Sequence, residues 1–380
     1  MRILQIYELN PLESIGGVEC AIFQLSKELV NLGHEVTILT GASNKRCMFS
    51  KDGIDVISFD MFGIMRHTYC SGSLTPMRQF LFLTSIIVKK LDLKYDIYHG
   101  HIYTSGLLAN YLARKYDGIA VNTIHGSYYP VWNTLTNPFA AFFYKKVERY
   151  LSTLLAKRSH RQIHVSTYFA KQVAEWGGRV KVIPNGVDTS AFHPGIIANF
   201  HSSVPVILTA RRLVRKNGLE YLIRSMGLLK EECKLLILGD GPERQNLEFL
   251  AKNTSRNIEF LGSVSYEDMP FYLAGADIAI VPSIMEASSL FMLEAMAMGK
   301  PVIASAVGGL PETLGDAGIL VPSMSPVSLA CEIEELLHDP EKRKKLGNKA
   351  RKRVEERFTC KKIAREIEKE YLRLWSEKNA

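Results

Sequence analysis

The chain has 380 residues, more than one hydrophobic core usually organises, so its length favours two domains. An apolar fraction of 47% and a charged fraction of 23% are typical of globular proteins and give no sign of a disordered tail or a low-complexity linker. Residues 1–200 carry 21 Lys and Arg against 14 Asp and Glu, whereas residues 201–380 carry 26 against 25. This surplus indicates an anionic partner of the first half: a lipid surface, a phosphorylated acceptor or nucleic acid.

The first half predicts an alternation of short apolar strands and amphipathic helices. Its first strand, Ile3–Tyr7, starts without a secretory signal pattern before it, so the expected location is cytoplasmic. A helix over Val18–Leu32 follows, with apolar residues at helical spacing and Gly33 at its end. This order predicts a parallel, doubly wound sheet. The other strands are expected at Val36–Leu39, Ile97–His99, Ala120–Ile124 and Val180–Ile183.

The segment Phe139–Arg161 is strongly amphipathic, because its apolar residues form a stripe that basic residues flank. A helix lying on an anionic membrane surface has this character, and so does a helix that packs its stripe into the core. The pattern favours the core-packed helix, with peripheral contact at the inner face of the membrane as the alternative. The stripe comprises Phe139, Phe142, Phe143, Val147, Tyr150, Leu151, Leu154 and Leu155, and the basic residues are Lys145, Lys146, Arg149, Lys157, Arg158 and Arg161.

A turn-rich stretch that begins at Pro184 has neither helical nor strand periodicity, and the alternation of strands and helices restarts after it. The expected division is an N-terminal domain over residues 1–188, a linker over 189–203, a C-terminal domain over 204–358, and a helix over 359–380 that packs back on the N-terminal domain. Strands of the second domain are expected at Val206–Thr209, Leu235–Leu238, Ile258–Leu261, Ile278–Val281, Pro301–Ala304 and Ile319–Val321. Helices are expected from Leu219, after Pro242, from Glu267, from Leu290 and between Pro326 and Trp375.

The predicted fold class is therefore α/β, with two doubly wound, Rossmann-like domains that face an interdomain cleft. Ligands of such sheets bind at the carboxyl ends of the strands. The segment 282–302 follows a strand and opens a helix, and its small side chains leave backbone N–H groups accessible at the helix start. Glu294 lies roughly 7–8 Å farther along the helix axis, where the ribose of a bound nucleotide would lie. Glu286, just before the helix, is placed for a sugar on the distal phosphate.

Glu286, the seven residues after it and Glu294 resemble the signature of glycosyltransferase family 4 and its retaining two-domain relatives. The family pattern continues as Glu-Ala-Met-Ala-x-Gly-x-Pro-Val, which residues 294–302 match. Further family segments occur in family order, so the resemblance covers nearly the whole chain. They are Gly16-Gly17-Val18-Glu19, Ile124-His125-Gly126, Ile183-Pro184-Asn185-Gly186-Val187-Asp188, Arg212-Leu213-Val214 and Gly239-Asp240-Gly241-Pro242.

The resemblance implies the GT-B architecture and a retaining transferase whose donor, a UDP-, GDP- or ADP-sugar, lies mainly on the C-terminal domain and whose acceptor lies on the N-terminal domain. Front-face attack is implied, in which the leaving diphosphate helps to accept the acceptor proton. Catalytic roles are implied for Glu286, Arg212, Lys216 and His125, with His125 against the donor sugar. Donor-binding roles are implied for Glu294, Ser288, Ser289, Leu290, Gly16, Gly17 and Val264.

The chain departs from the family pattern in two places. Residues 287–289 read Ala-Ser-Ser where the family often has Gly-Phe-Gly, so serine hydroxyls add donors where glycines would allow a closer approach. Asn217 stands where the family often has Lys, and Lys216 lies one residue earlier. We expect Lys216 to meet the diphosphate with Arg212, because only a cation offsets charge on a leaving group, while the alternative register through Asn217 stays open.

No Asp-x-Asp pair, a common holder of a divalent metal in glycosyltransferases, occurs in the sequence, so no metal and no cofactor are expected. His99 and His101 share one face of a strand without a carboxylate or cysteine to complete a metal site, and we interpret them as structural or acceptor-lining. Nucleic acid is not an expected partner. The alternatives are a sugar-nucleotide epimerase of the same architecture and a non-catalytic nucleotide-sugar-binding protein. Only a transferase needs an acceptor to release the nucleotide diphosphate.

Overall fold

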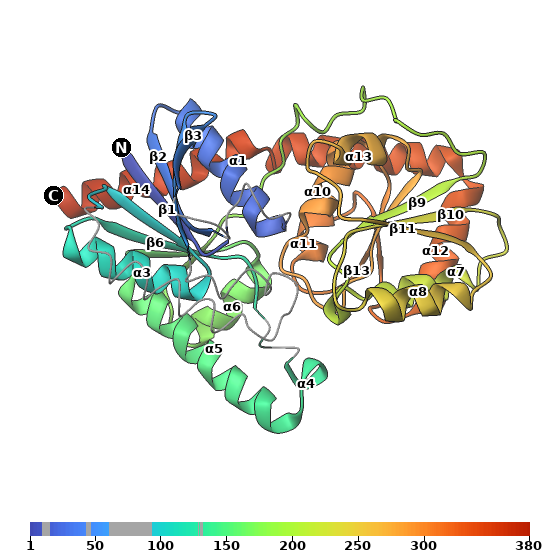
Figure 1. Cartoon of the computed structure of the whole chain (residues 1–380), viewed down its shortest axis with the longest axis horizontal. Coiled ribbons are helices and arrows are strands. Elements are labelled where there is room, and N and C mark those ends of the chain that lie inside the picture. Colours follow the sequence, from blue (N-terminus) through green and yellow to red (C-terminus); the bar gives the residue numbers. More distant parts are fainter. Residues whose placement is uncertain (10–15, 43–46, 61–92, 128, 130–131) are drawn as a thin grey trace. The chain divides into compact units, whose positions relative to one another are not determined.

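The computed structural model describes residues 1–9, 16–42, 47–60, 93–127, 129 and 132–380. These residues form two compact units (Figure 1), the first comprising Met1–Pro184 with Lys361–Ala380 and the second Asn185–Cys360. Each unit is built on a largely or wholly parallel sheet with helices on both faces. The predicted α/β class with two Rossmann-like domains is therefore confirmed.

The first unit contains an eight-stranded sheet in the order β3-β4-β2-β1-β5-β6-β7-β8. Neighbouring strands are parallel except for β3 and β4, which form an antiparallel hairpin at one edge. Strands β5 and β6 are buried along their whole length because the sheet is covered on both faces, and they bury polar residues such as His99 and Asn122 as well as apolar ones. The strands are β1 (Arg2–Tyr7), β2 (Glu35–Ala42), β3 (Cys47–Lys51), β4 (Ile54–Asp60), β5 (Ile97–His101), β6 (Ile119–Ile124), β7 (Arg161–His164) and β8 (Val180–Val182).

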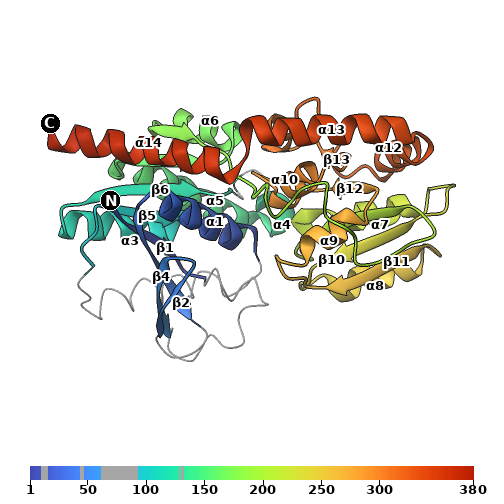
Figure 2. The same ribbon diagram turned by 90° about the horizontal axis from the view of Figure 1, so that it is seen from above.

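Helices from the two ends of the chain cover one face of this sheet. They are α1 (Gly17–Asn31) and α14 (Cys360–Asn379), both labelled in Figures 1 and 2. Ile22 of α1 and Tyr371 of α14 belong to the same buried cluster. The opposite face is covered by α3 (Ile102–Lys115), which packs beside α5 (Pro138–Arg158). The other helices in the described part of this unit are α4 (Trp132–Leu135) and α6 (Thr167–Glu175).

The second unit contains a six-stranded sheet in the order β11-β10-β9-β12-β13-β14, in which all pairs are parallel. The strands are β9 (Val206–Ala210), β10 (Lys234–Leu238), β11 (Asn257–Gly262), β12 (Ile278–Val281), β13 (Val302–Ser305) and β14 (Ile319–Val321). Residues 189–203, expected to be a linker, belong to this unit, because Phe192 is fully buried in its core.

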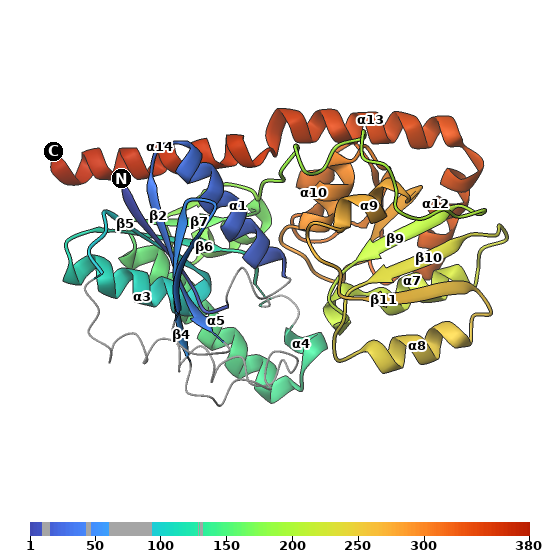
Figure 3. The same ribbon diagram turned by 45° about the horizontal axis from the view of Figure 1, so that its top comes forward.

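One face of the second sheet packs against α7 (Leu219–Met226), α8 (Arg244–Lys252) and α12 (Pro326–His338), and Figure 3 shows α8 beneath β11. The other face packs against α10 (Leu290–Ala297) and α13 (Pro340–Arg357), whose apolar side chains form a separate cluster. Helices α9 (Met269–Ala274) and α11 (Leu310–Leu314) lie on the same face.

Candidate functional site

Strands β9 and β12 are neighbours at the point where the strand order of the second sheet reverses. From β9 the chain continues outward through β10 and β11, and it then returns to place β12 on the other side of β9. Crevices at such switch points, outside the carboxyl ends of the strands, bind ligands in open α/β sheets. The loops that follow these two strands, residues 211–217 and 282–289, hold most of the predicted site residues of this unit.

Main-chain contacts join the two loops. The N–H of Ile284 donates a hydrogen bond to the carbonyl of Lys216 over 2.8 Å. Gly218 adopts a φ of +67°, and a Cβ added there would lie 2.0 Å from the carbonyl oxygen of Pro282. Only glycine fits both the left-handed conformation and this close approach.

The opposite side of the second loop is held in a similar way. The carbonyl of Glu286 accepts a hydrogen bond from the N–H of Gly309 over 3.0 Å. A Cβ at Gly308, whose φ is +54°, would lie 1.9 Å from the same carbonyl oxygen. The loop 282–289 is therefore held by the Gly218 turn at Pro282 and by the Gly308–Gly309 turn at Glu286, which restricts where the carboxylate of Glu286 can lie.

The start of α10 presents backbone donors. Ser289 is the N-cap, and its hydroxyl accepts a hydrogen bond from the N–H of Met292 over 3.2 Å. Its carbonyl accepts from the N–H of Leu293. Among the described residues, the amides of Leu290 and Phe291 have no recorded acceptor. These amides and the helix dipole form a site where a phosphate group can bind.

Glu294 lies one turn inside this helix and is only 8% exposed. Burial raises the pKa of its carboxyl group from 4.5 to about 7. Ionising such a group in the free protein is costly, and ligand hydroxyls that donate to the carboxylate would offset that cost. Its assignment to the ribose stays a prediction.

Arg211 is the residue that the sequence analysis missed. Its side chain, 7% exposed, forms an ion pair with Glu286. Its Nη1 donates to Oγ of Ser289 and its Nη2 donates to Oδ1 of Asn217, both over 3.4 Å. The only signal in the sequence is the tandem arginine pair after β9, in which the family resemblance points to the second member, Arg212.

The two predicted cations occupy different surroundings. Arg212 is exposed and Lys216 is half-buried, and neither is the ion-pair partner of Glu286. Asn217 is 4% exposed, and its Nδ2 donates to the carbonyl of Arg212 over 2.7 Å. The structure thus brings Glu286, Ser289 and Asn217 together around Arg211, whereas Val264 lies beyond β11 and packs against the core of the unit.

In the first unit, the predicted glycines lie at the start of α1. Gly16 is the N-cap of this helix and Gly17 is its first residue. A Cβ at Gly16 would lie 2.1 Å from a carboxylate oxygen of Glu19, a side chain that is 6% exposed. This contact is with the end of a flexible side chain and Gly16 has an extended backbone, so the fold alone does not demand glycine here, and the donor contact stays a prediction.

His125 follows β6 and belongs to a chain of polar side chains within the first unit. Its Nε2 lies 3.0 Å from Nδ1 of His101, whose Nε2 lies 2.7 Å from Oε1 of Gln5. Burial is the main cause that holds the pKa of His101 well below 6.5, so this ring is neutral at pH 7. Because an amide oxygen only accepts, His101 donates to Gln5 and accepts from His125. This assignment places the proton of a neutral His125 on Nε2.

His99 is also a buried structural side chain. Its Nδ1 lies 2.5 Å from the hydroxyl of Tyr371 and its Nε2 lies 2.7 Å from Oγ1 of Thr123. Burial lowers the pKa of His99 to about 3. Within the described ranges, no group of three or more His, Cys, Asp or Glu side chains is arranged to hold a metal ion.

The aromatic part of the α5 stripe is exposed, whereas Leu155 at its C-terminal end is fully buried, so the core-packed interpretation was wrong for the aromatic residues and right for this last turn. Phe139 is 85% exposed, Phe142 60% and Tyr150 66%. The residues that α5 buries are instead small or polar for the most part. The exposed aromatic residues and most of the core-facing residues lie on different sides of the helix, which periodicity alone could not distinguish. Across the described part of the chain, no helix has the length and apolar character needed to cross a bilayer.

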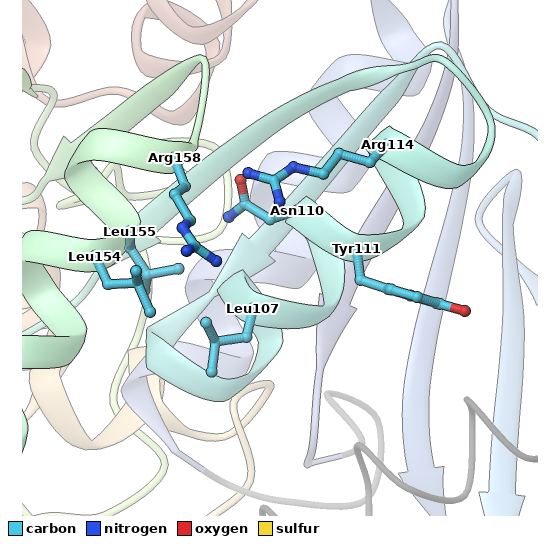
Figure 4. Close-up of a pocket in the computed structure, with 7 residues that line it drawn as sticks. All are labelled: Leu107, Asn110, Tyr111, Arg114, Leu154, Leu155 and Arg158. Atoms are coloured by element: carbon cyan, nitrogen blue, oxygen red, sulfur yellow. The ribbon is translucent and has the colours of Figure 1, made fainter.

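A cavity of about 230 Å³ lies between α3 and α5 (Figure 4). Figure 4 shows Arg114 of α3 and Arg158 of α5 on either side of Asn110, with leucines nearby. Both arginines are exposed. The lining residues are Leu107, Asn110, Tyr111, Arg114, Leu154, Leu155 and Arg158.

Comparisons with known proteins agree with this architecture. Residues 197–353 match the family model described as glycosyl transferases group 1, and residues 15–191 match that of Glycosyltransferase Family 4. An uncharacterised glycosyltransferase of Methanocaldococcus jannaschii is 28% identical over 96% of both chains. A GDP-mannose-dependent monoacylated α-(1-6)-phosphatidylinositol monomannoside mannosyltransferase of Corynebacterium glutamicum is 36% identical over 46% of this chain and 51% of its own.

Among solved structures, a sucrose-phosphate synthase of Thermosynechococcus elongatus superposes with a TM-score of 0.88 at 25% identity, covering 99% of both chains. The fold, the two family models and these relatives lead to one assignment. The chain belongs to the group 1 glycosyltransferases of the GT-B fold, with an N-terminal half of the family 4 type.

Proposed function

We propose that the chain transfers a sugar from a nucleotide diphosphate to an acceptor with retention of anomeric configuration. The observation that supports this most is the arrangement at the start of α10. The amides of Leu290 and Phe291 can bind a phosphate, Glu294 lies one turn inside the helix, and Glu286 lies just before it. A nucleotide sugar has its phosphates, ribose and sugar in the order that these groups would accommodate.

In this proposal, the donor diphosphate binds at the helix start and its ribose hydroxyls donate to Glu294. The sugar lies against Glu286. As the glycosidic bond breaks, the diphosphate gains negative charge, which the helix dipole, Arg212 and Lys216 stabilise. Retention follows when the acceptor attacks the face that the diphosphate leaves, with the diphosphate accepting the proton of the acceptor.

The donor can be identified by thermal denaturation with UDP-, GDP- and ADP-sugars, because a ligand raises the midpoint by binding the folded state. The stabilising sugar nucleotide is then incubated with and without candidate acceptors, and release of the nucleoside diphosphate is measured. We expect release only with an acceptor. Conversion of the sugar nucleotide to its epimer without acceptor would support an epimerase, and stabilisation without either reaction a binding protein. NMR of the product then gives the anomeric configuration.

We also propose that transfer needs no divalent metal, because cations and helix dipoles can take its role at the diphosphate. Activity should survive an excess of chelator and should not rise when Mg²⁺ or Mn²⁺ is added back. Loss of activity under chelation, with recovery on metal addition, would contradict this proposal. The sugar-nucleotide thermal shift in chelator serves as the control, since it separates a binding effect from a catalytic one.

A second part of the proposal concerns an anionic membrane surface as partner of the first unit. The exposed aromatic residues of α5 lie among Lys145, Lys146 and Arg149, and Arg114 and Arg158 border the neighbouring cavity. Exposed aromatic side chains with basic residues around them are typical of helices that lie in a lipid interface. The similar mannosyltransferase of Corynebacterium glutamicum carries a phosphatidylinositol mannoside in its name, which is in line with a lipid acceptor.

Sedimentation with vesicles of phosphatidylcholine, alone or with phosphatidylglycerol, tests the membrane contact. We expect binding to the anionic vesicles, weakened by salt and by Lys145→Glu/Lys146→Glu. Phe142→Ser/Phe143→Ser should weaken binding as well. Phe249→Ser, at a phenylalanine of α8 that is 70% exposed, is the matched control. Absence of vesicle binding would contradict the proposal. If the parent chain instead self-associates and the α5 variants do not, the exposed face of α5 binds a second copy of the chain.

A further inference from the structure

Arg211 is the most buried of the cationic side chains on the loop between β9 and α7. Its side chain is 7% exposed, whereas Arg212 and Arg215 are exposed and Lys216 is half-buried. We propose that Arg211 is a donor-binding residue that exchanges its ion pair with Glu286 for the diphosphate of the donor. The inference rests on the proposed function, since it names a cation that the sequence did not assign to that site.

The position of the guanidinium supports this role. Its Nη1 donates to Oγ of Ser289 over 3.4 Å, and Ser289 is the N-cap of α10. Arg211 therefore lies at the end of the helix where the amides of Leu290 and Phe291 are available. A phosphate bound to those amides would lie within reach of the guanidinium, which has more N–H donors than its present contacts use. The planar fork of arginine also suits phosphate oxygens better than a point charge does.

The charge balance explains why an exchange is needed. The carboxylate of Glu286, whose side chain is 13% exposed, would repel a diphosphate at the same helix end. Its ion pair with Arg211 neutralises this charge in the free protein. When the donor binds, sugar hydroxyls can donate to Glu286 while Arg211 turns to the phosphates. Both buried charges then keep a partner. This matters because a buried charge without a partner is strongly destabilising.

Asn217 holds the guanidinium in place. Its Nδ2 donates to the carbonyl of Arg212 over 2.7 Å, so its Oδ1 is directed to Nη2 of Arg211. A neutral acceptor at this position suits the neighbouring cation, whereas a lysine there would place a second positive charge beside Arg211. The positions 211 and 217 are thus matched, with the charge at the first and the acceptor at the second.

Calorimetric titration with UDP, GDP and ADP, and with uridine, guanosine and adenosine, tests this role. For the diphosphate that binds, Arg211→Ala should lower the affinity by about 10- to 100-fold, the scale of a charge-assisted hydrogen bond. The affinity for the corresponding nucleoside should not change, because it has no phosphates. Arg215→Ala, at an exposed arginine on the same loop, is the control and should bind the diphosphate nearly as the parent chain does.

The match between the two positions gives a second test. Asn217→Lys alone should weaken diphosphate binding, while Arg211→Ala/Asn217→Lys should bind better than Arg211→Ala, because lysine then supplies the missing charge. If Arg211→Ala does not fold, Arg211→Lys should keep the preference for diphosphate over nucleoside and Arg211→Gln should lose it. If Arg211→Ala binds the diphosphate as tightly as the parent chain does, the role of Arg211 is overturned but the proposed function is not. Where Arg211→Ala does not fold, the same result with Arg211→Gln has the same meaning. A parent chain that binds none of the diphosphates would overturn the proposed function itself.

Discussion

Glu294 illustrates how one residue can carry both a cost and a function. Its carboxyl group is buried, and burial raises its pKa from 4.5 to about 7. A buried residue chosen only for packing would be expected to be apolar, as are Leu293 and Ala295 beside it. The carboxylate is therefore better explained by a ligand that donates hydrogen bonds to it than by the stability of the free protein.

This predicts a pH-dependent gain in stability for Glu294→Gln. The pKa of this group is higher in the folded than in the unfolded state, so below pH 4.5 it is protonated in both states and costs no stability. As the pH rises from 4.5 toward 7, the unfolded state ionises first, and the unfolding free energy falls. Removing the charge should raise the unfolding free energy by about 2–4 kcal/mol at pH 8 and change it little at pH 4. Urea denaturation of both proteins at the two pH values measures the difference. An equal effect at both would mean that ionisation is not the cause.

Donor binding should release a proton for the same reason. Ribose hydroxyls stabilise the ionised form of Glu294, so binding should lower its pKa from about 7. Titration calorimetry of the stabilising nucleoside diphosphate at pH 6.5, in buffers of different ionisation enthalpy, gives the number of protons released. We expect the parent chain to release protons on binding and Glu294→Gln to lack this release. Any protons from the phosphate itself are released equally with both proteins and therefore cancel in the comparison.

At the scale of elements, periodicity predicted most of the two sheets, because buried parallel strands are continuous apolar runs and their helices have one apolar face. It missed the β3–β4 hairpin, although Asp52 and Gly53, with φ of 52° and 76°, form the two-residue turn that such hairpins use. It also assigned the wrong environment to the aromatic residues of α5, because a stripe of apolar residues does not show whether protein covers it.

The candidate site was predictable to the level of its segments. Glu286, Ser289 and Glu294 do lie around the start of α10, because a strand–loop–helix order fixes where such residues meet. The partner of Glu286 could not be predicted, since two adjacent arginines in a loop point in directions that only the packing of that loop decides. The contact between Gly218 and Pro282, which sets this packing, joins residues far apart in the sequence.

Gly218→Ala should therefore disturb both stability and donor binding. The new Cβ would lie 2.0 Å from the carbonyl oxygen of Pro282, so the two loops must separate in addition to the strain of a positive φ. Gly262→Ala, at φ +74° with its nearest atom 3.6 Å away, adds the backbone strain alone. We expect a clearly larger fall in the melting midpoint for Gly218→Ala, accompanied by weaker nucleotide binding. Equal falls in the two variants would show that the loop contact is unimportant.

At the scale of the whole molecule, the chain passes between the units twice, after Pro184 and after Cys360. The two passages are tied to each other, because the N–H of Val187 donates to Phe358 over 2.8 Å and the N–H of Cys360 donates to Val187 over 3.0 Å. The second passage leads into α14, whose side chains complete the core of the first unit. The last helix of the sequence thus contributes to the core of the unit that the first residues begin.

Tyr371 provides the sharpest test of this dependence. It is fully buried against the first sheet and contacts His99 through its hydroxyl, so Tyr371→Ala should cost about 3–5 kcal/mol, as large-to-alanine changes in cores do. Tyr371→Phe loses the hydrogen bond but keeps the ring, and should cost about 1 kcal/mol or somewhat more. Leu372→Ala, on the same helix but 49% exposed, is the control.

The readout can be confined to the first unit, because all three tryptophans, Trp132, Trp176 and Trp375, belong to it. Tryptophan fluorescence during urea denaturation should shift to lower midpoints in the order Leu372→Ala, Tyr371→Phe and Tyr371→Ala. Nucleotide binding by the second unit, measured without denaturant, should stay close to that of the parent chain. A parent-like fluorescence midpoint for Tyr371→Ala would mean that the first unit holds together without its C-terminal helix, and that α14 is an attachment to a core already complete.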